Sequence, residues 1–375
     1  MKLGDICDVY SGHALKEFNS ENNGLPVIKI GNILPNGSLL LGDCQYSNEN
    51  VHEKYFSKYG DIYVALSGAT TGKIGIMHSK EKHIINQRVG IVRKKDNDTP
   101  ESFIKYFLLH QTERILNEAS GCAQPNISPK QIALYEVPNY DNNEILNIVS
   151  SLDKISNIIK LLKQQLQLLD DLVKARFVEM FGDPELNTKG FKTVLLSDIA
   201  EYYNGLTYSP DNVSEKGTIV LRSSNIQNSQ LDFEDTVIVN CNIRDKFFVK
   251  NNDILMCSRN GSARLVGKGA LITEISEPMT FGAFMMIIRS EFYSYLMTYF
   301  QMDAFRRQIS TGATTTINQI TGNMLNKIIL PLPDMSDVNQ FATFVEQIDK
   351  SKFVIQKSLD ETQLLFDSLM QEYFG

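Results

Sequence analysis

Short runs of apolar residues, many of them β-branched, alternate along the chain with segments rich in Gly, Asn and Ser. This pattern predicts strands in an irregular, mixed sheet. The runs form two groups, and we expect one sheet from each. The first group covers residues 27–30, 61–66, 74–77 and 84–92, and the second covers 218–221, 253–257, 269–273 and 284–289.

A helix is predicted after each group of strands. Thr99 offers a capping hydroxyl and Pro100 suits the first helical position, ahead of apolar residues at helical spacing. Residues 291–309 form the counterpart in the second group. Both predicted helices run into glycine-rich loops.

Each group is also preceded by a short amphipathic segment, residues 3–10 in the first and 196–203 in the second. We expect a helical turn in both places. Gly12 and Gly205 follow these segments and suit a helix C-terminal cap.

Each group ends in a long stretch whose apolar residues recur at alternating steps of four and three. In the first stretch, which has one tight step from Leu152 to Ile155, they are Ile145, Val149, Leu152, Ile155, Ile159, Leu162, Leu166, Leu169, Val173, Phe177 and Met180. In the second they are Phe341, Val345, Ile348, Ile355, Leu359, Phe366, Leu369 and Tyr373, with polar Lys352 and Thr362 on the same ladder. Sustained heptads predict a coiled coil, and helices of this length span roughly 50–55 Å. Antiparallel pairing of the two stretches would bury both apolar seams within one chain.

The two groups are copies of one another. Leu3, Asp5, Ile6, Tyr10 and Gly12 recur 193 residues later as Leu196, Asp198, Ile199, Tyr203 and Gly205. The same displacement relates Ile127 to Ile320 and Pro138 to Pro331, and it relates Phe181 to Phe374. One displacement kept through both halves indicates an internal duplication.

The expected architecture is therefore two tandem, pseudo-symmetric α+β domains separated by two long helices that form an antiparallel coiled coil. The domains cover residues 1–143 and 193–337, and the helices cover 144–184 and 338–375. Residues 185–192 are the linker. This arrangement predicts a spacer with a globular unit at each end.

Composition excludes several classes of protein. The net charge of −7 argues against a freestanding nucleic-acid binder, although local patches or a basic partner could provide positive charge. The five cysteines are widely spaced and include no Cys-x-x-Cys, so neither a disulfide framework nor a metal site is indicated. No signal core and no run of about 18 apolar residues is present, and we expect a cytoplasmic protein that does not enter a membrane.

Catalytic motifs are weak or missing. Residues 67–73 resemble a phosphate-binding loop, but only three residues separate Gly68 from Gly72, and Ile74 follows Lys73 where Ser or Thr should bind magnesium. A glycine-rich loop between strands explains the segment better. The five histidines are scattered, and no nucleophile elbow is present. We predict no catalytic residues, no bound cofactor and no metal site.

The most cationic segment of each copy lies around its middle strands. Seven Lys and Arg residues accompany a single acid, Glu81, between Lys73 and Lys95, and a basic stretch without acids lies between Asp253 and Glu274. A charge run is often a solvated face, but these charges share loops with amide and hydroxyl side chains. Arg, Asn and Gln can bond base edges, while Lys, Ser and Thr suit phosphates. Our candidate DNA-binding residues are Thr71, Lys73, Gln87, Arg88, Gln124, Asn126, Arg259, Asn260, Arg264, Thr315 and Asn318.

The order of these features resembles a known family. Each copy starts with Leu-x-Asp-Ile and contains a later Asn-Ile segment, a strand that begins with Asp-Ile (Gly-Asp-Ile in the first copy), and a late Ile-Ser/Thr element before Val/Leu-Pro. These features are similar to the target-recognition domains of type I restriction-modification specificity subunits. Residues 174–184 look like the central conserved region of those subunits, and residues 371–375 look like the distal one.

The resemblance implies a DNA reader without catalysis of its own. Each target-recognition domain would read one half of a bipartite, asymmetric sequence in duplex DNA, and the helices would fix the gap at about one helical turn, roughly 34 Å. Two modification subunits would supply S-adenosylmethionine and methyl transfer, and restriction subunits could join them. The family's DNA contacts vary, so the candidate residues above rest on charge and loop placement.

Two other functions remain open at this point. The chain could be a structural scaffold whose helices space two protein-binding domains, with ordinary basic loops. A self-contained methyltransferase or nuclease is the third hypothesis, which binding of S-adenosylmethionine by the isolated chain would support.

Overall fold

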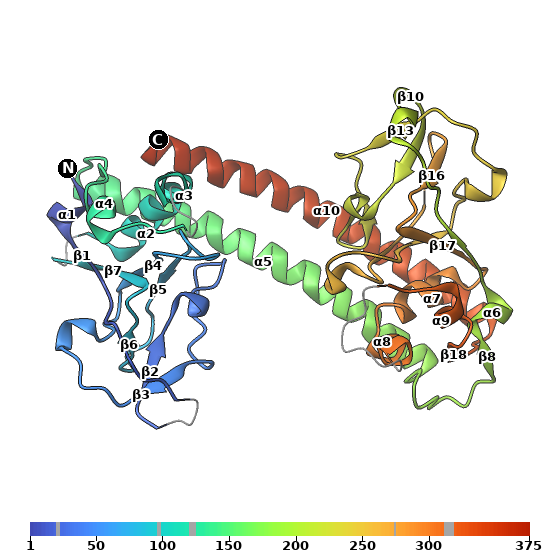
Figure 1. The fold of residues 1–375 in the computed structure, drawn as a ribbon, viewed down its shortest axis with the longest axis horizontal. Helices are drawn as coiled ribbons and strands as arrows, with labels where there is room; N and C mark the ends of the chain where they lie inside the picture. Colours follow the sequence, from blue (N-terminus) through green and yellow to red (C-terminus); the bar gives the residue numbers. More distant parts are fainter. Residues whose placement is uncertain (20–22, 96–98, 120–124, 274, 311–318) are drawn as a thin grey trace. The chain divides into compact units, whose positions relative to one another are not determined.

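The computed structural model describes the chain except for residues 20–22, 96–98, 120–124, 274 and 311–318. It contains two compact units, each with one globular domain (Figure 1). Unit 1 comprises residues 1–163 and 357–375, and unit 2 comprises residues 164–356. Each long helix therefore begins in one unit and ends in the other.

Unit 1 contains a four-stranded antiparallel sheet in the order β1-β7-β4-β5 and a three-stranded sheet in the order β3-β2-β6. The first consists of β1 (Cys7–Ser11), β7 (Val89–Lys94), β4 (Ile62–Ala65) and β5 (Ile74–Ile76). The second consists of β3 (Gln45–Ser47), β2 (Leu25–Ile28) and β6 (Ile84–Ile85). The helical elements of the domain are α1 (Leu3–Ile6), α2 (Glu101–His110), α3 (Thr112–Ala119), α4 (Pro129–Ala133) and the 3₁₀ turns η1 (Ile30–Asn32) and η2 (Glu53–Tyr55).

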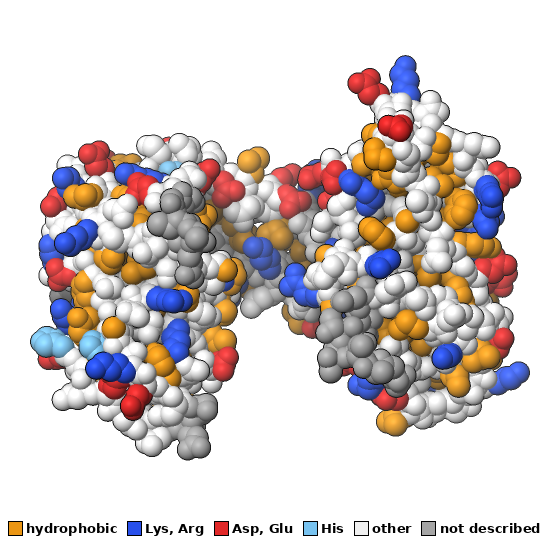
Figure 2. All heavy atoms as spheres, in the orientation of Figure 1, with side chains coloured by type: hydrophobic (Ala, Val, Ile, Leu, Met, Phe, Trp, Pro, Cys, Tyr) orange, Lys and Arg blue, Asp and Glu red, His pale blue; other side chains and the backbone are white. Residues whose placement is uncertain are grey.

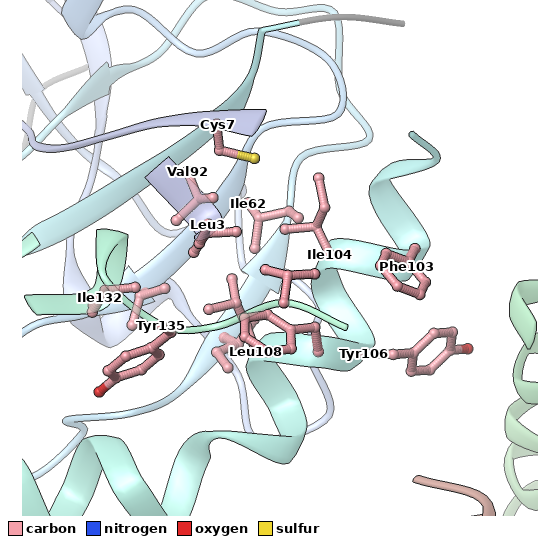
Figure 3. Packing of buried hydrophobic residues seen from close by; sticks show 14 of the residues in the cluster. Leu3, Cys7, Ile62, Val92, Phe103, Ile104, Tyr106, Leu108, Ile132 and Tyr135 are labelled. Atoms are coloured by element: carbon pink, nitrogen blue, oxygen red, sulfur yellow. The ribbon is translucent and has the colours of Figure 1, made fainter. Parts of the chain in front are cut away.

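Strand β4 lies between two apolar layers, which explains why its sequence is apolar without interruption. Ile62 and Val64 pack with the helices in one core cluster, which Figure 3 shows around Leu3, Ile104 and Leu108. The alternate residues Tyr63 and Ala65 pack with β2 and β6 in a second cluster. Successive side chains on a strand point to opposite faces, so both faces of β4 are buried.

Unit 2 repeats this plan. Its four-stranded sheet has the order β15-β14-β17-β9, and its three-stranded sheet has the order β13-β10-β16. Their strands are β15 (Gly269–Leu271), β14 (Ile254–Cys257), β17 (Met285–Arg289), β9 (Glu201–Asn204), β13 (Val237–Val239), β10 (Val213–Leu221) and β16 (Met279–Phe281). Two short pairs are formed by β11 (Ile226–Gln227) with β12 (Gln230–Leu231) and by β8 (Thr193–Leu195) with β18 (Ile329–Pro331). The helical elements are α6 (Leu196–Ile199), α7 (Tyr293–Tyr299), α8 (Asp303–Ser310), α9 (Gly322–Leu325), η3 (Pro210–Asn212), η4 (Ser223–Asn225), η5 (Asp245–Phe247) and η6 (Ala263–Leu265).

The duplication is visible in buried polar contacts as well as in strand order. Arg93 of β7 forms a bidentate ion pair with buried Asp61, with Nε to Oδ1 at 2.7 Å and Nη2 to Oδ2 at 2.6 Å. Arg289 of β17 pairs with Asp253 in the same way, at 2.7 Å for both bonds. Burial lowers the pKa of Arg93 while the hydrogen bonds to Asp61 raise it, and the net shift is upward.

A buried asparagine closes the equivalent loop in each unit. Asn32 accepts a hydrogen bond from the backbone of Lys29 and donates its amide to two carbonyls farther along the chain. Asn225, 193 residues later, makes the same three contacts, beginning with the backbone of Arg222. The Asn that recurs in both copies therefore stabilises a loop through its side-chain hydrogen bonds.

The amphipathic segments at the start of each copy are shorter helices than predicted. Residues 3–6 are helical, but residues 7–11 form β1, which pairs with β7 across its whole length. Gly12 does not cap a helix. A Cβ at Gly12 would lie 2.3 Å from the carbonyl oxygen of Ile85, and one at Gly205 would lie 2.1 Å from that of Gly282, so close backbone approach requires glycine at both positions.

Three further predictions were wrong in detail. The run 84–92 was expected to be one strand, but a turn divides it into β6 and β7, which belong to different sheets. The single helices expected after each sheet are both broken, into α2 with α3 and α7 with α8. Pro100 is itself the N-cap residue of α2, without a side-chain capping bond.

The long helices are α5 (Asn142–Phe181) and α10 (Met335–Phe374). In unit 2, Phe177 contacts Phe341 with ring centroids 5.8 Å apart, and Asp170 forms an ion pair with Lys352. The contact that lies later in α5, at Phe177, lies earlier in α10, at Phe341, so the two helices pair antiparallel in unit 2. The predicted seam residues of both helices are buried or partly buried. No helix in the described part of the chain is long and apolar enough to cross a membrane.

The ends of each helix enter the domain cores. Phe374 and Met370 of α10 belong to the core of unit 1, together with Leu152 of α5. Phe181 of α5 belongs to the core of unit 2 and packs edge-on against Tyr295, with ring centroids 5.1 Å apart. The aromatic residues that end both copies are therefore core residues.

Candidate nucleic-acid interface

The loop after β4 in unit 1, residues 67–73, is closed by its own backbone. Gly72 N donates to Ala65 O and Ala65 N donates to Lys73 O, each at 2.9 Å. Thr71 is only 7% exposed, and its hydroxyl donates to Gly68 O at 2.7 Å. Thr71 therefore shapes this loop, whereas Lys73 at its end is partly exposed.

The turn between β6 and β7 lies beside that loop. Leu66 N donates to Arg88 O at 2.9 Å, and Val89 N closes the turn on Asn86 O at 2.9 Å. The two central residues, Gln87 and Arg88, are exposed. Both candidate side chains thus project from a turn that the backbone anchors to the end of β4.

A third segment meets the same place. Gly68 N donates to Pro125 O at 3.1 Å, and Ile127 N donates to Leu66 O at 2.9 Å. Asn126, between these two residues, is exposed. Gln124 lies outside the described residues. The structure therefore brings Lys73, Gln87, Arg88 and Asn126 to one end of the sheet of unit 1.

Unit 2 builds the same cluster from its own residues. Ser258 N donates to Phe284 O at 2.9 Å, and Ile320 N donates to Ser258 O at 2.7 Å. Arg259 forms a β-bridge with Gln319, as Ser67 does with Asn126 in unit 1. Three segments therefore converge after β14 as they do after β4.

The candidate residues of unit 2 differ in how free they are. Arg259 and Arg264 are exposed, and Arg264 lies in the 3₁₀ turn η6. Asn260 is partly buried, and its side chain donates to Ser223 Oγ at 3.4 Å and accepts from Ser262 N at 3.0 Å. Asn260 thus has less bonding capacity left for a ligand than either arginine. Thr315 and Asn318 lie outside the described residues.

The sequence-based search missed several residues at this surface. Phe284 is 60% exposed and lies under the guanidinium of Arg259, with Cζ 5.9 Å from the ring centroid. Beside it is a pocket of about 350 Å³ lined by Tyr208, Arg222 and Ser223, among others. Phe284 was assigned to a strand. The repeat did not reveal it, because the displacement between the copies is 193 residues at Gly12 but 196 residues here, where Phe284 corresponds to Arg88.

Charge at the candidate interface is local. On the face shown in Figure 2, Lys and Arg side chains lie among Asp and Glu side chains in both units.

Lys268 stands at the end of the loop after β14, as Lys73 stands at the end of the loop after β4, and its ammonium donates a hydrogen bond to Ile226 O. Burial raises the pKa of Cys257 at the end of β14, so this thiol favours its neutral form.

Comparison with known proteins identifies the family. A model described as the type I restriction modification DNA specificity domain matches residues 1–169 and 188–362. These two matches cover most of the chain, one for each copy of the repeat. The chain therefore belongs to the family of type I restriction-modification DNA specificity domains.

Two curated relatives are specificity subunits of type I restriction enzymes. The StySPI subunit of Salmonella potsdam is 26% identical over 177 residues, which cover 44% of this chain and 38% of that protein. The MjaVIII subunit of Methanocaldococcus jannaschii is 27% identical over 185 residues, which cover 46% of this chain and 43% of that protein. Each match spans about two fifths of the relative's length.

Solved structures share the fold over the whole chain. The S subunit of a type I restriction-modification system from M. genitalium has a TM-score of 0.56 at 15% identity, covering 100% of this chain and 95% of that one. A chain from a structure of type I system assembly and conformational transition has a TM-score of 0.53 at 13% identity, covering 100% and 96%. The two tandem α+β domains and their long helices are thus the fold of these subunits.

Proposed function

We propose that this chain is the DNA sequence-specificity subunit of a type I restriction-modification system. Each domain would read one half of a bipartite, asymmetric target in double-stranded DNA, and the paired helices would fix the gap. The observation that carries the proposal is the loop cluster repeated after β4 and β14. In each unit, a loop, a turn and a third segment meet at one end of the four-stranded sheet, and the loop presents exposed or partly exposed basic side chains there.

The chemistry of the cluster in unit 1 suits base reading. Arg and Gln bond purine edges in the major groove in a bidentate manner, and Arg88 and Gln87 are exposed neighbours on a backbone-anchored turn. Lys73 and Asn126 flank them and suit phosphate or base contacts. A site on a rigid element positions such groups better than a free loop does.

Methyl transfer would belong to partner subunits and not to this chain. Two modification subunits would bring S-adenosylmethionine, which this chain would not bind, and restriction subunits could join them. The assembled enzyme would act on cytoplasmic DNA. Positive charge from these partners would offset the net charge of −7 and allow an acidic chain to hold DNA.

Exposed apolar side chains on the long helices support a protein partner. Leu161 and Leu168 of α5 are one heptad apart and lie off the coiled-coil seam, 58% and 65% exposed. Leu364 of α10 is 73% exposed. Apolar residues that recur on an exposed helix face are typical of protein interaction sites. We assign these side chains to the contact with the modification subunits.

The substitution Arg88→Ala tests DNA reading in unit 1. If Arg88 bonds a base edge, the variant should lose about 1–3 kcal/mol of binding free energy and relax one position of one half-site. The measurement is the set of methylated sites in DNA modified by the chain together with its modification subunits. Lys130→Ala, which changes an exposed residue of α4, is the control and should leave the target unchanged.

Three other outcomes would each change the interpretation. Weaker binding to all sequences alike would make Arg88 a phosphate contact. An unchanged target would remove the β6–β7 turn from the reading surface. No sequence-specific methylation even with the unsubstituted chain would favour the protein-binding scaffold instead.

A further inference from the structure

The turn that carries Gln87 and Arg88 has an equivalent in unit 2 with opposite chemistry. Val89 N donates to Asn86 O at 2.9 Å in unit 1, and Met285 N donates to Gly282 O at 2.8 Å in unit 2. Both turns therefore hold two residues between the paired backbone groups. Counting from these bonds, Ala283 occupies the place of Gln87, and Phe284 occupies the place of Arg88.

A second pair of bonds gives the same alignment. The residue after β4, Leu66, donates its N–H to the carbonyl of Arg88, and the residue after β14, Ser258, donates its N–H to the carbonyl of Phe284, both at 2.9 Å. The glycines packed on the preceding carbonyls, Gly12 and Gly205, agree with it. The side chain at this place is exposed in both units. Arg88 and Phe284 thus present a cation and an aromatic ring from equivalent positions.

Arginine and serine side chains lie near Phe284, together with apolar side chains such as Leu206 and Met285. The guanidinium of Arg259 lies over its ring, with Cζ 5.9 Å from the centroid. The neighbouring pocket of about 350 Å³ is lined by the hydroxyl residues Ser223 and Ser224 and by Arg222. Arg222 Nε is buried and has no hydrogen-bond partner among the described residues. Arg222 Nη2 is already paired with Asp235 Oδ2 at 2.8 Å, so Arg259 and the serine hydroxyls are the groups that suit the phosphates flanking a base.

We propose that Phe284 reads the 5-methyl group of a thymine in the half-site bound by unit 2. The proposal rests on the DNA-reading function above. The thymine methyl is the apolar group that base pairs expose in the major groove, and apolar side chains, including Phe, contact it. Arg88 reads base edges through hydrogen bonds at the same place in unit 1, so the duplicated scaffold reads two different kinds of base chemistry with one turn.

Uracil substitution tests this contact, because uracil lacks only the methyl group of thymine. The chain is purified with its modification subunits, and its affinity is measured for its own target with each thymine of the second half-site replaced in turn by uracil. One replacement should weaken binding by about fourfold, the effect of one buried methyl group. The Phe284→Ala variant should show no difference between thymine and uracil at that position, and Phe284→Leu, which keeps an apolar side chain, should retain it.

Matched variants make the result specific. Arg88→Ala should keep the thymine preference and alter only the other half-site. Phe284 is largely exposed, so neither Phe284→Ala nor Phe284→Leu should disturb folding. A second half-site without thymine, equal binding of thymine and uracil at every position, or a preference that survives in Phe284→Ala would overturn the assignment. Loss of all sequence specificity in the unsubstituted chain would instead overturn the proposed function.

Discussion

At the scale of single residues, the duplicated ion pairs set the geometry of the candidate interface. Asp61 and Asp253 stand just before β4 and β14, at the opposite end of each strand from the candidate interface. Each bonds an arginine of the adjacent strand, β7 or β17. These buried pairs hold the register of two central strands, and the register in turn brings the turn of Arg88 or Phe284 to the end of β4 or β14.

His110 makes the stability of unit 1 depend on pH. It lies at the end of α2 beside Phe374 of α10, with ring centroids 6.3 Å apart, and burial lowers its pKa below the ordinary 6.5. Below pH 6.5 the His110 site therefore binds more protons in the unfolded chain than in the folded one. The contribution of the neutral ring is complete above pH 6.5 and is lost as the pH falls through the lowered pKa.

We predict that His110→Gln reduces this dependence. Thermal unfolding of the unsubstituted chain at pH 7.5 and pH 5.5 should give a larger difference in Tm than the variant gives. His78→Gln, at an exposed histidine, should behave like the unsubstituted chain. An identical pH dependence in all three proteins would contradict the assigned role.

Single residues also show what the sequence alone could not predict about the candidate interface. Gln87 and Arg88 were chosen as candidates because an amide and a charge stand out in an apolar run. Phe284 was not found because an aromatic residue before a strand looks like core, and only the backbone bonds of the turn show that it points outward. Thr71 was chosen for its hydroxyl, which the folded loop uses internally.

At the scale of elements, heptad spacing predicted the long helices well because burial on a coiled-coil seam is periodic. The breaks within α2–α3 and α7–α8 could not be predicted in this way, since Phe107 and Ile115 keep helical spacing and share one core across the break. The division of residues 84–92 depends on pairing between distant strands. Such pairing is a tertiary property that local pattern does not contain.

The exposed leucines of the helices give a prediction at this scale. Leu161→Glu with Leu168→Glu should prevent the modification subunits from co-purifying with the chain, because two carboxylates would lose their hydration in the contact. The far-ultraviolet circular dichroism of the isolated chain should not change, since both side chains are exposed. Leu186→Glu is the control, because Leu186 is 74% exposed but lies outside both helices. Normal co-purification of the double variant would place the partner contact elsewhere.

At the scale of the whole molecule, the internal repeat is the feature that the sequence revealed most clearly. A single displacement predicted two like domains, and the strand orders β1-β7-β4-β5 and β9-β17-β14-β15 agree with it. The displacement rises from 192 residues at Asp61 to 195 at Lys73, because the loop after β14 is longer than the loop after β4, and it is 196 at Arg93. The candidate interfaces of the two units differ where that alignment shifts, as at Arg88 and Phe284.

The spacer hypothesis predicts the effect of shortening both helices. Removal of one heptad from α5 and one from α10 would shorten each by about 10 Å, the length of roughly three base pairs. The methylated target should keep both half-site sequences and change only its gap. Altered half-site sequences would show that the helices do more than set spacing.

The most direct test of the central claim is to exchange one domain. The chain is produced with its modification subunits, methylated adenines are mapped by single-molecule sequencing, and the map is repeated after one globular domain is replaced by that of another family member. The account predicts one bipartite target, of which only one half changes on the exchange. No defined target, or a change in both halves at once, would contradict independent reading by the two domains.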